Sequence, residues 1–176
     1  MIPTPDWAPF EVVARGEHSP GPRSIQSAEG IGDRLRAAAF AEIQAREAFN
    51  WASEHFGDAS PALRTEWKGL ALAEDRHYGW LLKRMQELGV AVTERRVSDQ
   101  LWVSLRSCKD AREFALYMAN AEDRGRQAGE RFCREMESRD PMTARIFGEI
   151  AKEEVAHIAL AARYFPSSDA AIALAP

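Results

Sequence analysis

The sequence predicts an all-α fold, a four-helix bundle of two repeated helical hairpins joined by a long crossover. Three observations support this prediction. The chain is 45% hydrophobic and 28% charged, with many helix-forming residues and few of the alternating patterns typical of strands. Apolar residues recur at spacings of three and four over long segments. A pattern of glutamate and histidine also occurs twice, the second copy 80 residues after the first.

The repeated pattern is one glutamate followed, 32 residues later, by a Glu-x-x-His motif. Its members are Glu42, Glu74 and His77 in the first copy and Glu122, Glu154 and His157 in the second. Other residues keep the same offset, so the pattern indicates duplication of one helical hairpin. These are Pro61 and Pro141, Leu70 and Ile150, Ala71 and Ala151, Arg46 and Arg126, and Trp67 and Phe147.

The chain should begin with an extended arm over residues 1–27, which holds more than half of the prolines. Trp7, Phe10 and Val12 are suited to clamp this arm onto the helices. The bundle is predicted over residues 28–165 and a short tail over 166–176. At 176 residues the chain needs no further domain.

In the first hairpin, apolar periodicity predicts a helix over residues 28–56, and Gly57 is a natural stop. The next helix should begin at Ser60 and Pro61, a capping residue followed by proline at the first helical position. It should end before Gly89. This hairpin carries the first copy of the pattern.

Residues 89–107 form a connection whose length is typical of a crossover, and a short helix is expected within it. The third long helix is predicted over residues 109–137. The fourth should open at Asp140 and Pro141, again a cap followed by proline, and should end at Pro166. This hairpin carries the second copy.

The net charge and hydropathy of the chain limit the classes of partner that we expect. A net charge of −4 argues against a nucleic-acid partner, which usually needs a clustered basic face. No run approaches the ~20 apolar residues of a membrane span, so no membrane partner is expected. The chain does not start with a basic segment followed by an apolar one, so we expect no secretory signal and a cytoplasmic location.

The repeat should bring its six glutamates and histidines together. In each hairpin the two carboxylates are equidistant from the predicted turn, and a spacing of three places each Glu-x-x-His pair on one helix face. Four carboxylates in an apolar core repel one another unless cations lie between them. We therefore predict two divalent metal ions. The alternative is a metal-free bundle with buried Glu–His hydrogen bonds.

This ligand pattern is that of di-iron and di-manganese carboxylate proteins. Carboxylate oxygen and imidazole nitrogen suit iron or manganese. The expected cofactor is therefore two iron ions, with two manganese ions or a mixed Mn/Fe pair as alternatives. No catalytic residue beyond the six metal ligands is identified.

Three segments resemble the ferritin-like superfamily. Residues 42–46 (EIQAR) are similar to the first-helix segment of rubrerythrins, and residues 73–77 (AEDRH) and 153–157 (EEVAH) to the second- and fourth-helix ligand motifs. A closer likeness is to a bacterial ferritin-like family of unassigned function. It is carried by Glu42-Ile43-Gln44-Ala45, His77-Tyr78, Leu88-Gly89, residues 99–102 (DQLW) and residues 154–159 (EVAHIA). The resemblance covers about residues 28–165 and implies the fold and the metal site, without a substrate.

Three charged residues are candidates for a supporting role around the ligands. Related oxygenases often place aspartate directly before each ligand glutamate, and Glu153 occupies one such position, where it would accept a hydrogen bond from His77. The alternative is a solvated Glu153. Arg46 and Arg126, each four residues after a ligand glutamate, would offset carboxylate charge or form ion pairs on their own helices.

The predicted function is an oxidoreductase, an oxygenase or oxidase, that uses dioxygen or peroxide to oxidise a small organic substrate. Gly125 and Gly129 would open a substrate pocket beside the metals, or instead allow close helix packing. An external electron donor is expected, and a homo-oligomer is compatible with the sequence. The alternatives are a ferroxidase, iron-storage or peroxide-scavenging protein without an organic substrate, and an interaction scaffold that keeps metal for stability.

Overall fold

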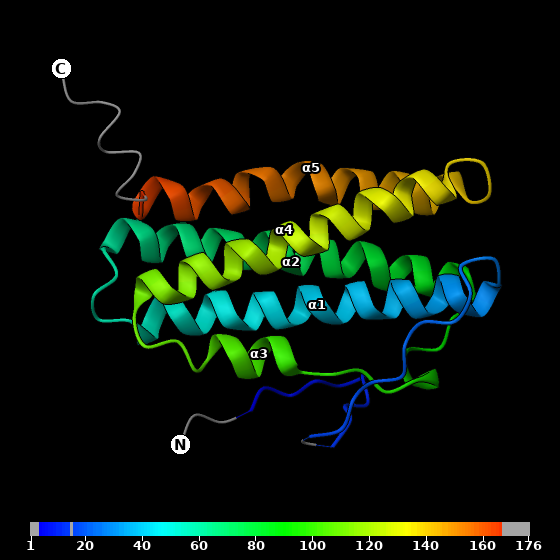
Figure 1. Cartoon of the computed structure of the whole chain (residues 1–176), viewed down its shortest axis with the longest axis horizontal. Coiled ribbons are helices and arrows are strands. Elements are labelled where there is room, and N and C mark those ends of the chain that lie inside the picture. The colour runs from blue at the N-terminus through cyan, green and yellow to red at the C-terminus, as the bar shows by residue number, and fades with distance from the viewer. Residues whose placement is uncertain (1–3, 15, 167–176) are drawn as a thin grey trace. The chain divides into compact units, whose positions relative to one another are not determined.

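Figure 1 shows the computed structural model of the chain, which describes residues 4–14 and 16–166. Within these residues the fold is all-helical, with no β-strand, so the predicted all-α class is confirmed. The ferritin-like arrangement stays a prediction. In chain order the elements are α1 (Ala28–His55), α2 (Pro61–Glu87), the 3₁₀ turn η1 (Val92–Glu94), α3 (Gln100–Leu105), α4 (Ala111–Met136) and α5 (Pro141–Tyr164).

The helix ends fall where the sequence predicts them. The Ser60 hydroxyl accepts a hydrogen bond from the backbone N–H of Leu63 (3.2 Å), and the Asp140 carboxylate accepts one from that of Thr143 (3.1 Å). Asp110 caps α4 in the same way. Each cap satisfies an N–H group that the first helical turn leaves unpaired. The division of the chain into arm, bundle and tail stays a prediction, because helix ends do not define domains. The predicted tail, residues 166–176, lies outside the described residues except for Pro166.

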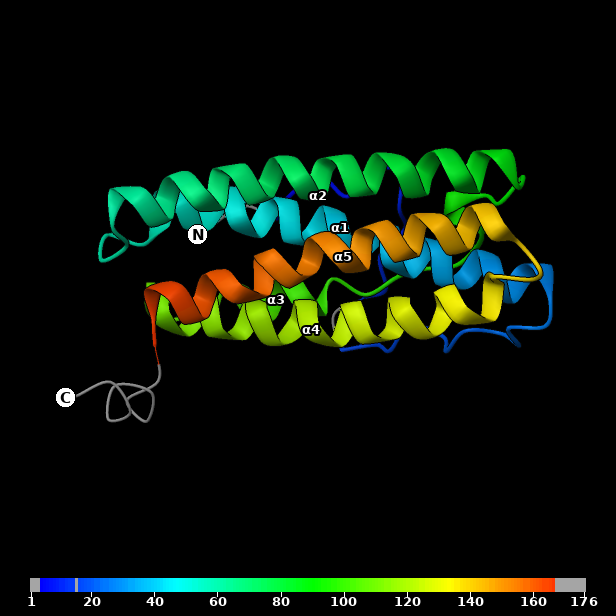
Figure 2. The ribbon, with the colours of Figure 1, turned by 90° about the horizontal axis from the view of Figure 1, so that it is seen from above.

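Two compact units divide the chain. The first runs up to Trp51 and includes Trp67–Ser104, whereas the second takes in Ala52–Glu66 and the chain from Leu105 onward. In the first unit, α1 and α2 lie side by side and antiparallel (Figures 1 and 2). The crossover is tied to α1 through Gln44, whose side-chain oxygen accepts the backbone N–H of Trp102 in α3 (3.0 Å).

The N-terminal arm packs within the first unit. The rings of Trp7 and Phe10 are buried against Phe40 of α1, with centroids 5.4 and 5.0 Å from it. Val12 pairs with Val97 of the crossover in an isolated β-bridge. The apolar residues of the arm therefore hold it beside α1 and the crossover, because burying them removes apolar surface from water.

In the second unit, α4 and α5 lie antiparallel along their lengths (Figures 1 and 2). Phe132 and Phe147 meet edge to face between them, with ring centroids 4.8 Å apart. This geometry is one that aromatic pairs prefer. None of the described helices combines the length and apolar character needed to cross a membrane.

Candidate metal centre

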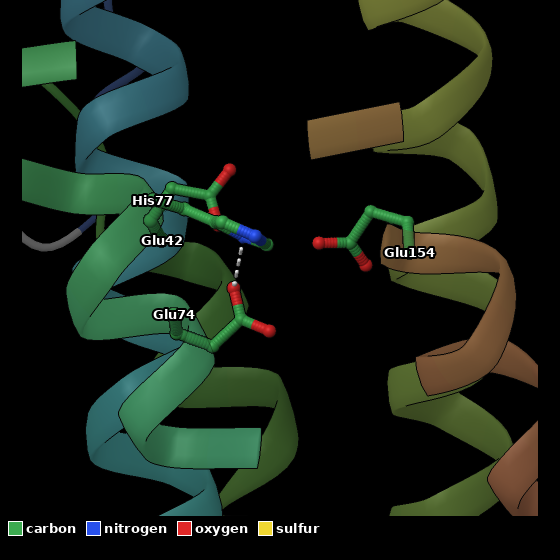
Figure 3. Close-up of side chains that lie close together, drawn as sticks. All are labelled: Glu42, Glu74, His77 and Glu154. Atoms are coloured by element: carbon green, nitrogen blue, oxygen red, sulfur yellow. Dashed lines mark ion pairs between the residues drawn. The ribbon is translucent and has the colours of Figure 1, made fainter. Parts of the chain in front are cut away.

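The first unit contains one complete copy of the repeated pattern, which we call the first half-site: Glu42 from α1 and Glu74 and His77 from α2. Their side chains converge in Figure 3, which also labels Glu154 on α5. The Nδ1 atom of His77 lies 3.4 Å from Oε2 of Glu42 and 3.6 Å from Oε2 of Glu74. Glu74 and His77 are buried. The three residues each offer a ligand atom within 4.8 Å of the others.

The second unit contains the second half-site: Glu122 from α4 and Glu154 and His157 from α5. Here Nδ1 of His157 lies 3.5 Å from Oε2 of Glu154. Ligand atoms of these three residues also lie within 4.8 Å of one another. Glu154 and His157 are buried, and Glu122 is half-buried. Both copies of the repeat therefore produce the same local arrangement.

Helical periodicity explains why these polar side chains turn inward. On α2, Trp67 and Leu81 are buried on either side of the Glu-x-x-His pair, and on α5 Ile150 and Leu160 are. Residues three and four apart on a helix share a face. The apolar pattern that buries these neighbours thus also buries the glutamate and histidine between them.

Each half-site offers two carboxylates and one imidazole. Two ligands of one ion at metal–ligand distances near 2.1 Å are about 3.0–3.4 Å apart, close to the nitrogen–oxygen separations of 3.4–3.6 Å found here. This donor set suits borderline divalent cations such as iron, manganese or zinc. The clusters could therefore bind metal ions, and binding would compete with protons because the carboxylates must be ionised and the imidazole neutral.

Arg46 and Arg126 pair with acidic residues that are not metal-ligand candidates. Arg46 reaches across to α2, where its Nη1 donates to Asp75 (2.6 Å), and it also contacts Glu47 (2.8 Å). Burial acts to lower the pKa of Arg46, but the hydrogen bonds to Asp75 and Glu47 outweigh it and the pKa is raised. Arg126 stays on its own helix, with Asp123 three residues before it as one partner.

The structure says less about the roles predicted for three other residues near the half-sites, Glu153, Gly125 and Gly129. Glu153 is half-buried on α5, and its predicted bond to His77 stays a prediction. Gly125 is exposed, with open space where a Cβ would be. A Cβ at Gly129 would lie 3.5 Å from the Phe147 ring, an ordinary packing contact. Gly129 thus lies where α4 approaches α5.

One neighbour of the first half-site was not predicted. The ring of Trp80 lies 5.4 Å from that of His77 between centroids, and the guanidinium of Arg76 lies 5.6 Å from the Trp80 centroid. Trp80 is half-buried, so it connects a buried ligand with the surface. Its spacing of three from His77 on one helix is the signal that could have identified it.

No curated protein and no solved structure matches the chain. A family model described as "Protein of unknown function (DUF455)" matches residues 5–174. That match covers the arm from residue 5 onward, the helices α1 to α5 and the residues of both half-sites. The chain therefore belongs to the DUF455 family.

Proposed function

We propose that the chain is a di-iron carboxylate protein, with one ion at each half-site and the two ions acting together on dioxygen or peroxide to oxidise a small organic substrate. The observation that carries this proposal is the duplicated donor set, two glutamates and one histidine within 4.8 Å in each unit. A metal-free bundle would have to keep two buried or half-buried carboxylates close together in each copy with no cation to offset their repulsion.

The chemistry of the donors favours a redox metal over a purely structural one. Structural zinc sites are usually closed by four nitrogen or sulfur ligands. Each half-site instead offers three candidate protein ligands, of which two are carboxylates. When bound, a pair of iron ions would supply the electrons that activate dioxygen or peroxide, and an external donor would have to restore them.

The chain's own residues would prepare the site for this chemistry. In both half-sites the nitrogen nearest the carboxylates is Nδ1, which leaves Nε2 to carry the proton of the neutral imidazole. The glutamates would balance the charge of the ions. Burial of both histidines would limit access of water and strengthen these electrostatic interactions.

Metal analysis tests the proposal directly. Protein prepared with ferrous iron, and separately with manganese, should hold about two ions per chain, one for each half-site. The variant Glu74→Ala/Glu154→Ala should lose most of this metal while its helical circular dichroism persists. A matched control, Glu54→Ala/Glu135→Ala, removes two exposed carboxylates from α1 and α4 and should keep it. Trace metal in the wild-type protein with an unchanged fold would refute the proposal.

The reaction with dioxygen then identifies the class of chemistry. Ferrous protein mixed with dioxygen should give a transient visible absorption that decays faster when a suitable organic substrate is present. Mössbauer spectra should show that the two ions are magnetically coupled, as adjacent ions are. Steady iron oxidation with mineral growth would instead favour a storage protein. Rapid peroxide consumption without substrate oxidation would favour a scavenger.

A further inference from the structure

A cavity of about 370 Å³ lies in the first unit, away from the half-site ligands. Its walls are residues 19–22 of the arm, the first half of α1, and residues 95–98 and Leu101 of the crossover. The apolar part of the lining includes Phe40, Val97 and Leu101. This volume lies within the range of about 300–1,000 Å³ typical of small-molecule sites.

The polar lining is strongly cationic. Among the described residues of the lining, the only carboxylate is that of Asp33, whereas four are arginines: Arg34, Arg36, Arg95 and Arg96. The Asp33 carboxylate already forms ion pairs: its Oδ1 lies 3.0 Å from Nη1 of Arg36, and its Oδ2 lies 2.6 Å from Nη1 of Arg95. It also pairs with an arginine outside the lining, Arg23, at 2.7 Å. We call Asp33, Arg23, Arg36 and Arg95 the arginine hub.

The hub keeps Asp33 ionised yet leaves an excess of positive charge. Hydrogen bonds from Arg23 hold the pKa of Asp33 well below its usual range. Arg36 is buried, and its Nε and Nη2 groups donate to the carbonyl oxygens of Ala91 and Val92 and to the carboxylate of Glu94. Asp33 and Glu94 together supply two carboxylates to three arginines, Arg23, Arg36 and Arg95, which leaves one positive charge in excess.

Two of the lining arginines retain donors for a ligand. Arg34 donates through Nη1 to the carbonyl oxygens of Arg23 and Gly30, and Arg95 donates through Nη1 to Asp33. Within the described part of the chain, the Nε and Nη2 groups of Arg34 and Arg95 have no hydrogen-bond partner. Arg96 is largely exposed and lies 3.8 Å from Glu11.

The cavity lies on the other side of α1 from the first half-site. Phe40 and Gln44 line the cavity, and each is two residues from Glu42. Two residues correspond to about 200° around a helix. A molecule in the cavity would therefore not replace a metal ligand.

We propose that this cavity binds a small organic oxyanion, with its carboxylate or phosphate group against Arg34, Arg95 and Arg96 and its apolar body against Phe40 and Leu101. The planar guanidinium fork matches both oxyanions, and bonds to a charged group are among the stronger ones. The apolar floor would select against inorganic anions. The site is independent of the metal proposal.

Calorimetric titration of the full chain at low salt tests the site, with hexanoate, phenyl phosphate, inorganic phosphate and 1-hexanol as probes. Hexanoate or phenyl phosphate should bind, and more tightly than inorganic phosphate, which has no apolar body, or 1-hexanol, which has no charge. Arg34→Gln/Arg96→Gln should weaken binding about tenfold or more, the order expected for losing a charged hydrogen bond. Ala37→Phe should weaken it by filling the cavity without changing charge.

Two controls separate binding in the cavity from nonspecific binding and from binding at the half-sites. Arg131→Gln removes an exposed arginine of α4 and should bind the probe as the wild type does. The metal-free variant Glu74→Ala/Glu154→Ala should also bind it unchanged. The proposal would be overturned if no organic anion bound, if 1-hexanol bound as well as hexanoate, if the arginine and Ala37 variants bound normally, or if binding required the metal ligands.

Discussion

The two half-sites share their candidate ligand residues but differ in the residues that surround them. In the first, residues 75–80 (DRHYGW) are polar and aromatic around His77, whereas in the second the corresponding residues 155–160 (VAHIAL) are aliphatic. This difference in sequence changes the partners of the corresponding arginines Arg46 and Arg126. Arg46 crosses from α1 to Asp75 of α2, but the counterpart of Asp75 is Val155, and Arg126 pairs along α4 instead. The duplication has thus retained the donor set while its surroundings diverged.

This divergence leaves the two half-sites with the same donor residues in unlike surroundings. Trp80 next to His77 has Leu160 as its counterpart, so only the first copy places an indole ring at this position. An indole that is half-buried offers an aromatic route between a buried imidazole and the surface. Substitutions in one copy at a time measure how far corresponding residues of the two copies are equivalent in metal binding and stability.

The largest effect is expected from removing one histidine at a time. His77→Ala and His157→Ala should each lower bound iron from about two ions per chain to about one, because each removes one of the three donors of its half-site. Metal analysis after gel filtration measures this. If one variant kept both ions while the other lost both, the two half-sites would not be equivalent.

The next effect concerns Asp33, whose counterpart at the same offset is Glu113. Asp33→Asn should destabilise the protein by about 2–3 kcal/mol, less than a fully buried pair because Arg23 is near the surface. Glu113 is exposed, and its carboxylate accepts the backbone N–H of Lys109 (2.8 Å). Glu113→Gln should therefore change stability by no more than about 0.5 kcal/mol. Urea unfolding of both variants measures the difference.

The effect of Asp33 should depend on pH. Its pKa is lowered in the folded chain by hydrogen bonds from Arg23, so its contribution is fully present above its unfolded value of about 3.9 and is lost as the pH falls below it. The stability difference between the wild type and Asp33→Asn should therefore be constant near neutral pH and shrink below about pH 4. A difference that grew in acid would contradict this assignment.

The two capping residues that precede a proline, Ser60 and Asp140, should differ less in their contributions to the free energy of unfolding than Asp33 and Glu113 do. Asp140→Ala should cost about 1–2 kcal/mol and Ser60→Ala about 0.5–1 kcal/mol. Asp140 loses more because its carboxylate also accepts the hydroxyl of Thr143, which is fully buried. Thermal unfolding of the two variants compares them. Equal losses would mean that the Thr143 hydroxyl adds nothing to the cap.

The smallest effect is expected at the salt bridge that distinguishes the copies. Asp75→Val makes α2 resemble α5 at this position and removes the 2.6 Å pair with Arg46. Asp75 is more than half exposed, so the loss should be about 0.5 kcal/mol or less. The reciprocal change, Val155→Asp, tests whether Arg126 will turn toward α5. A loss above about 2 kcal/mol for Asp75→Val would show that this pair does more than an exposed salt bridge.

Local patterns predicted much of the fold. The starts of α2 and α5 follow from a capping residue and a proline, and both caps are confirmed because capping depends on residues within one turn. The grouping within each half-site was likewise predictable from helical periodicity and the turn positions. The same spacing rule places Trp80 next to His77. Trp80 was nevertheless not predicted, because an aromatic side chain three residues after a candidate ligand is common in helix packing and does not by itself indicate a role at a metal site.

Short-range sequence patterns were enough to set the all-α class, the helix ends and the residues of each half-site, since all of these rest on repeats of three to four residues or on one fixed offset. Long-range packing instead set the pairing of Arg46 with Asp75 and of Arg95 with Asp33. Arg95 reaches Asp33 across 62 residues, and the cavity that both residues line needs the arm, α1 and the crossover to be in place. Such pairs depend on the way the chain folds back on itself, because a guanidinium can satisfy its charge with any carboxylate that packing brings near.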